Sequence, residues 1–89
     1  MYRITRLSDV GEATGLSLRN EFDAGVFHLV TNKPVVLNDT FLLIEKQISR
    51  QPKHLKRQGI KDAHWFKILI GEYVGWICAT GARFELLDM

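Results

Sequence analysis

Half of the basic residues in this 89-residue chain fall within one short stretch, which makes it the strongest candidate for chemistry. Residues 46–62 hold six lysines and arginines against one acid, whereas residues 1–45 hold four against six and residues 63–89 two against three. A concentrated cationic segment can bind phosphate groups or an acidic protein surface. With two neighbouring histidines, the candidate binding set is Lys46, Arg50, Lys53, His54, Lys56, Arg57, Lys61 and His64.

Part of this segment is predicted to be helical. Pro52 suits a first helical turn and Gly59 suits the position just after a helix C-terminus. In a helix over residues 50–58, the side chains of Arg50, Lys53 and Arg57 would share one face through i+3 and i+4 spacing. Mutual repulsion would keep such a loop mobile until it meets an anion. A solvated loop without a partner is the alternative reading, because most charge runs are of that kind.

Two aromatic residues join the candidate set. Trp65 and Tyr73 can supply contact area at low entropic cost, because each combines a large ring with a polar edge. Packing in the core is the alternative for the tryptophans, and it is favoured for Trp76. In an extended strand Trp76 and Ile77 point to opposite faces, so one of the two faces the interior, and the pattern does not say which.

Catalytic groups do not form a recognisable pattern, so no enzymatic activity, cofactor or metal site is predicted. The three histidines have no metal-ligand spacing with one another or with the single cysteine, and no serine stands in a nucleophile motif. Cys78 lies inside a predicted strand, where a small buried hydrophobe is the default. The loop acids Glu21, Asp23 and Asp39 show no spacing that would single out a pair.

Composition predicts one globular domain over residues 1–89. Hydrophobic residues make up 46% of the chain and charged residues 25%, which is typical of a folded protein. One cysteine excludes an internal disulfide. The N-terminal residues have no signal-peptide pattern, and no run of eighteen apolar residues predicts a membrane span. We therefore expect a cytoplasmic protein that does not bind membranes.

Period-2 alternation and apolar runs predict short β-strands along the chain. The clearest signal is the pair of strands on either side of Gly71 and Glu72, since these two residues form the two-residue loop of a type II′ hairpin between apolar arms. Residues 40–46 are apolar on both faces and are predicted to be a central strand. The basic insertion, about residues 47–63, should be a loop with one or two helical turns. The expected strands are residues 2–7, 16–19, 26–30, 40–46, 64–70, 73–78 and 83–87, with 35–37 a further strand or the approach to a turn.

Several of these segments resemble bacterial SH3 (SH3b) domains. Residues 13–19 are similar to the opening strand of that family, and residues 33–45 to its second long strand with its lead-in. Most distinctive are residues 65–77, which resemble its Trp-aromatic-Lys strand, glycine hairpin and Gly-Trp-Ile strand. The resemblance implies an all-β, small SH3-like barrel of five to seven short strands, with the helical turns confined to residues 48–62. Two departures are Asn20-Glu21 in place of the usual Gly-Pro, and the basic insertion at the position of the n-Src loop.

The resemblance and the charge together predict a non-enzymatic binding module. An intracellular adaptor or inhibitor, docking on a protein through the basic loop and an adjacent aromatic groove, comes first, and so short a module would suit a phage or mobile-element factor acting on a host protein. Binding of RNA or DNA through the same loop is the alternative. Cell-wall peptide binding, common in the family, is third. A homodimer is also possible, because residues 2–7 could pair as an uncovered strand across two copies.

Overall fold

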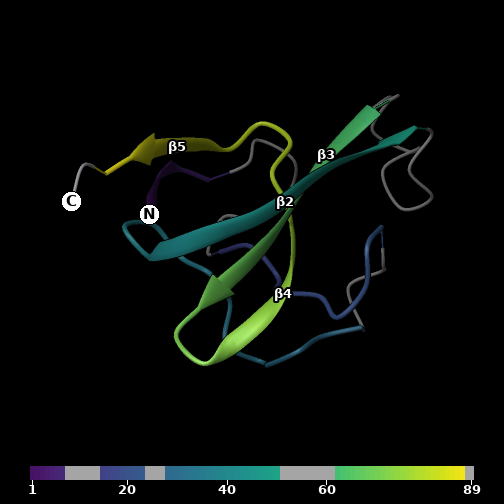
Figure 1. Ribbon diagram of the computed structural model, residues 1–89, viewed down its shortest axis with the longest axis horizontal. Coiled ribbons are helices and arrows are strands. Elements are labelled where there is room, and N and C mark those ends of the chain that lie inside the picture. Colours follow the sequence, from purple (N-terminus) through teal and green to yellow (C-terminus); the bar gives the residue numbers. More distant parts are fainter. Residues whose placement is uncertain (8–14, 24–27, 51–61, 88–89) are drawn as a thin grey trace.

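Five antiparallel strands form the structure, a computed structural model that describes residues 1–7, 15–23, 28–50 and 62–87 (Figure 1). They follow one another in the sheet as β4-β3-β2-β1-β5, and the described residues contain no helix. The all-β prediction is confirmed and is consistent with a small SH3-like fold, although the sheet is open and does not close into a barrel. No helix among the described residues is long and apolar enough to cross a membrane. The strands are β1 (Tyr2–Arg6), β2 (Thr40–Arg50), β3 (Asp62–Ile70), β4 (Tyr73–Cys78) and β5 (Arg83–Leu86).

The predicted hairpin is present as β3 and β4. Ile70 pairs with Tyr73 across a two-residue loop, and Gly71 has a φ of 58°. Glu72 is not among the residues with positive φ. Positive φ at the first loop position alone is the pattern of a type II′ turn, whose twist matches that of the strands. The prediction for this loop is therefore confirmed.

Strand β2 is central, as its apolar run predicts, because it pairs with β1 on one side and with β3 on the other. It is longer than predicted and continues through Arg50, while β3 begins at Asp62. The predicted loop over 47–63 was therefore too long at both ends, and a helix starting at Arg50 is wrong. The other residues of that helix lie outside the described part of the chain.

Two segments without regular strands pack against this sheet. Arg19 forms antiparallel bridges with both Leu29 and Trp76, and Leu16 forms one with Val35. The strands predicted over 16–19 and 26–30 are thus present only as isolated bridges, with residues 26 and 27 outside the described part. These bridges place the 15–23 segment along the free edge of β4, where it protects that edge from other chains.

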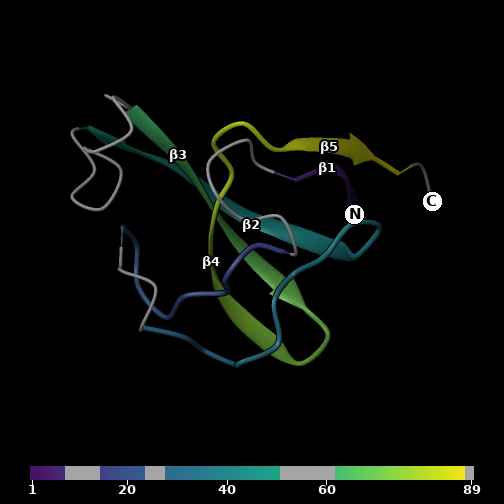
Figure 2. The ribbon, with the colours of Figure 1, turned by 180° about the vertical axis from the view of Figure 1, so that it is seen from behind.

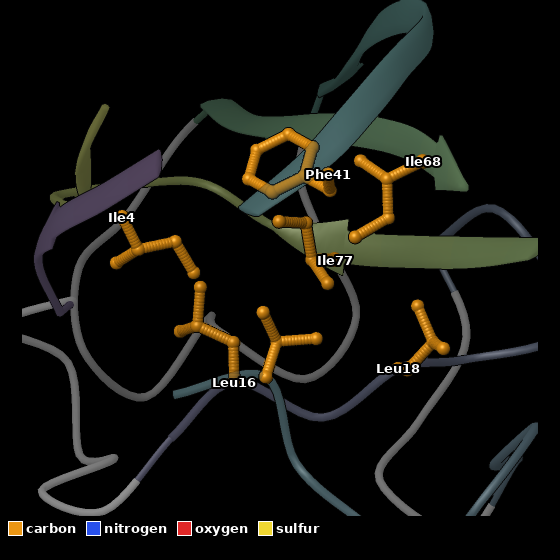
Figure 3. Close-up of a cluster of buried hydrophobic side chains, with 7 residues drawn as sticks. Ile4, Leu16, Leu18, Phe41, Ile68 and Ile77 are labelled. Carbon is orange, nitrogen blue, oxygen red and sulfur yellow. The ribbon is translucent and has the colours of Figure 1, made fainter. Parts of the chain in front are cut away.

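The main core lies between the sheet and these segments (Figure 3). Ile77 is completely buried in it, which answers the question about the faces of β4: the Ile77 side is the interior. Burying a side chain of this size contributes about 1.5–3 kcal/mol, so these residues dominate the stability of the fold. The buried cluster consists of Ile4, Leu16, Leu18, Val35, Phe41, Ile68 and Ile77.

The two ends of the described chain lie side by side, as both views show (Figures 1 and 2). Tyr2 of β1 pairs with Leu86 of β5, and the amide of Leu87 donates to the carbonyl oxygen of Met1 at 2.9 Å. Because β1 pairs with both β2 and β5, it is not an uncovered strand. The basis for a dimer through residues 2–7 is therefore lost.

Candidate binding surface

Strands β2 and β3 continue past the core as a two-stranded ribbon, which projects to the upper right of Figure 1. We call residues 46–50 and 62–66 the β2–β3 ribbon. Its register pairs Lys46 with Phe66, Ile48 with His64 and Arg50 with Asp62. The pairing shifts between Leu43 and Glu45, where an irregularity of the bulge type redirects the strand beyond the core. The ribbon therefore brings one end of the predicted basic segment out from the body of the protein.

One face of the ribbon is covered except at Gln47, which is exposed. Ser49, Ala63 and Trp65 are buried on it, and Trp65 has no exposed surface at all. The cover comes from the 15–23 segment, where the ring of Phe22 meets Trp65 edge-on at 6.2 Å between centroids. Phe22 also packs on Trp76 at 5.3 Å. These contacts make a second, smaller core on the side of the hairpin opposite to Ile77.

Arg19 completes this cover. Its side chain is buried, and its guanidinium carbon lies 4.9 Å from the centroid of the Trp65 ring. Its backbone is tied to β4 in both directions, because the amide of Arg19 donates to the carbonyl of Trp76 at 2.8 Å and the amide of Trp76 donates back at 2.7 Å. A desolvated guanidinium over an indole face is favourable by about 2 kcal/mol. Arg19 therefore holds the covering segment against the ribbon.

The opposite face of the ribbon is open to solvent. Alternation along both strands places the side chains of residues 46, 48 and 50 beside those of residues 62 and 64, and all five residues are exposed. We call this set the open face: Lys46, Ile48, Arg50, Asp62 and His64. Ile48 has an exposed fraction of 50%, large for an isoleucine in a strand. Two cations, Lys46 and Arg50, therefore flank an apolar side chain on an exposed surface that also carries Asp62.

The geometry of the open face is set by its neighbours. The ammonium nitrogen of Lys46 lies 5.7 Å from the ring centroid of Phe66, within the range of a cation–π contact. The backbone of His64 is fixed on both sides, because its amide donates to Thr80 Oγ1 at 2.9 Å and its carbonyl accepts from the amide of Ala79 at 2.7 Å. In the described part of the chain, no ion pair joins Arg50 to Asp62. Among the described residues, neither charge is neutralised by an ion pair.

The structure brings only some of the predicted site residues together. Lys46, Arg50 and His64 share the open face, whereas Trp65 is a packing residue, the alternative that the sequence left open. Tyr73 lies at the other end of the hairpin, paired with Ile70, six residues along β3 from His64. At about 3.3 Å per residue, that separation is about 20 Å. The other predicted residues lie outside the described part of the chain: Lys53, His54, Lys56, Arg57 and Lys61.

Sequence reasoning missed three residues that shape this surface. Ile48 lies in the segment that was predicted to be a basic loop, and Phe22 lies in a polar connector between predicted strands. Arg19 was considered only as part of residues 13–19, which resemble the opening strand of SH3b domains. An aromatic residue alone among Asn20, Glu21 and Asp23 is a usable signal for a packing contact. Nothing local marks Ile48 as exposed, since its face depends on the shift of register at the bulge.

The described residues contain no group of three or more histidine, cysteine, aspartate or glutamate side chains arranged to hold a metal ion. The thiol of Cys78 is half-buried and lies 3.6 Å from Thr80 Oγ1. The open face offers charged groups and an apolar side chain for contact with another molecule. No protein-family model, curated protein or solved structure matches this chain.

Proposed function

We propose that this protein is a non-enzymatic binding module, and that it docks on an acidic protein surface through the open face of the β2–β3 ribbon and the adjoining basic segment. The observation that carries the proposal is the asymmetry of the ribbon. One face is buried under Phe22 and Arg19, while the other exposes Lys46, Ile48 and Arg50. Because packing on one face already fixes the conformation of the ribbon, little conformational entropy is lost when a partner binds the other face.

The exposed isoleucine favours a protein as the partner. An apolar side chain between two cations can fill a small pocket on a protein, while the cations meet carboxylates around it. Residues 51–61 add four lysines and arginines and no acid, so the segment between the two strands extends the same charge. The resemblance to bacterial SH3 domains, together with the all-β fold, supports a role in recognition.

Nucleic acid is the second candidate, because the same cations could neutralise phosphates. The two functions differ in their salt dependence. Six to ten phosphate contacts lose about 10³- to 10⁵-fold in affinity between 50 and 200 mM salt, and fewer contacts lose proportionally less. Fluorescence anisotropy with single- and double-stranded RNA and DNA oligomers at these two salt concentrations therefore measures the nucleic-acid contribution directly.

The test of the first candidate is capture from a bacterial lysate by the immobilised protein, with and without nuclease. We expect a defined protein to be captured at physiological salt, and nuclease to leave the capture unchanged. The double variant Lys46→Glu/Arg50→Glu should lose that protein while remaining folded, since both residues are exposed. Arg83→Glu is the control, because Arg83 is also exposed but lies on the edge strand β5, away from the ribbon.

Two results would contradict the proposal. Capture of the same protein by the double variant at wild-type level would show that the open face is not the contact surface. Loss of capture on nuclease treatment, together with steeply salt-dependent binding of the oligomers, would instead assign the surface to nucleic acid.

A further inference from the structure

A pocket of about 480 Å³ lies at the tip of the β3–β4 hairpin, away from the β2–β3 ribbon. The hairpin tip lies at the lower left of Figure 1, close to the chain that leads into β2. The buried side chains of Leu18 and Val35 contribute to its lining, as does Ile70. Its other lining residues include groups that are polar or charged: Thr31, Lys33, Asp39, Thr40, Glu72 and Tyr73.

Three charged side chains line the pocket, and two of them are acidic. In the part of the chain that the structure describes, neither Lys33 nor Glu72 has a side-chain ion pair or hydrogen bond. Asp39 uses one oxygen, because its Oδ2 accepts from the amide of Val36 at 2.9 Å. That bond orients the carboxylate and leaves its other oxygen available.

The carboxylate of Asp39 is held on a fixed turn. Asn38 has a φ of 72°, and its amide donates to the carbonyl of Ile4 at 2.9 Å. The amide of Ile4 donates back to the carbonyl of Asp39 at 3.1 Å. Because two backbone bonds tie this turn to the core strand β1, the position of the carboxylate does not depend on a ligand.

We propose that this pocket binds a lysine or arginine side chain of a peptide. The aliphatic stem would lie on Pro34 and Ile70, the less buried apolar residues of the lining, as long basic side chains cover apolar surface with their stems. The charged end would meet the carboxylates of Asp39 and Glu72 beside the ring of Tyr73. The ammonium of Lys33 is left to bind a carbonyl oxygen of the peptide backbone. This site prefers cations, so it differs from the open face and does not depend on the function proposed for it.

The experiment is a titration of the ¹⁵N-labelled full chain followed by heteronuclear NMR. The probes are three capped tripeptides, glycine-X-glycine, in which X is lysine, norleucine or glutamate. Norleucine keeps the aliphatic stem and lacks the ammonium group. We expect the lysine peptide to shift the amide signals of Thr40, Gly71 and Glu72. It should bind about three- to fivefold more tightly than the norleucine peptide, the scale of one exposed ion pair, and the glutamate peptide should bind most weakly.

Two variants locate the charge preference. Glu72→Gln should remove most of the difference between the lysine and norleucine peptides. Glu45→Gln is the matched control, since it makes the same change on an exposed residue outside the pocket and should leave the difference intact. Equal binding of all three peptides, shifts confined to the β2–β3 ribbon, or an unchanged preference in Glu72→Gln would each overturn the proposal.

Discussion

Gly75 is the position where a single methyl group should separate the covering segment from the sheet. A Cβ atom built there would lie 2.8 Å from the carbonyl oxygen of Arg19 and 2.9 Å from Cγ and Cδ1 of Leu18. Contacts this short are not tolerated, so the backbone of Arg19 or that of β4 must move. That oxygen accepts the 2.7 Å hydrogen bond from the amide of Trp76, and the movement would break it.

The expected cost of Gly75→Ala follows from two contributions. Overpacking a filled site costs about 1–3 kcal/mol. Losing both hydrogen bonds between Arg19 and Trp76 adds about 1 kcal/mol each, so the free energy of unfolding should fall by about 3–5 kcal/mol. A domain of this size has a total stability of about 4–13 kcal/mol. The variant should therefore melt at least about 12 °C below the wild type.

The assay combines guanidinium unfolding with amide hydrogen exchange. Trp65 and Trp76 report unfolding by fluorescence, and the amides of Arg19 and Trp76 report the docking of the covering segment. The control is Gly71→Ala, where no atom lies within 4 Å of the added Cβ but φ is +58°. It should cost only about 1–2 kcal/mol of backbone strain and leave both amides protected against local opening.

The reasoning is refuted if Gly75→Ala loses less than about 1 kcal/mol and the amides of Arg19 and Trp76 exchange as slowly as in the wild type. Such a result would mean that Leu18 and Arg19 move aside without cost, and that the close contact at Gly75 does not hold the covering segment.

Further predictions concern the two faces of the ribbon and the sheet edge. Trp65→Ala should lower the free energy of unfolding by about 3–5 kcal/mol, measured by chemical denaturation, because the side chain is completely buried. Ile48→Ser should change stability by less than about 0.5 kcal/mol yet reduce capture of the protein partner; an unfolded variant would contradict its exposed position. Arg3 and Glu85 form an ion pair at 2.6 Å between exposed side chains. A double-mutant cycle should find a coupling below about 1 kcal/mol that weakens with salt.

Much of the fold could be predicted because local signals agreed with the final packing. The alternation in residues 2–6, the apolar run that starts at Phe41 and the Gly71-Glu72 loop each correspond to a strand or turn in the structure. The two covering segments were harder, because Leu16 is held by a single bridge to Val35 and Arg19 by isolated bridges to Leu29 and Trp76. Their sequence alternates like a strand, but among the described residues the pairings are isolated bridges and form no named strand.

The candidate surface was harder to predict, since small residues occupy its buried positions. Ser49 and Ala63 are buried on the ribbon while Ile48 is exposed, so the usual relation between hydrophobicity and burial is inverted there. Trp65 lies on a hairpin with packing on both faces, and alternation therefore cannot tell core from surface. Whether Trp65 is buried or exposed is decided by Phe22 and Arg19, which are more than forty positions away from it in the sequence.

The pairing of β1 with β5 has a practical consequence for how the protein can be joined to other molecules. Residues at both ends of the described chain emerge together at the left of Figure 1, while the ribbon points to the right along the longest dimension of 38 Å. A fusion partner or surface tether attached at either end would leave the ribbon accessible. The same proximity means that the whole unit could be inserted into a surface loop of another protein with little strain on either chain.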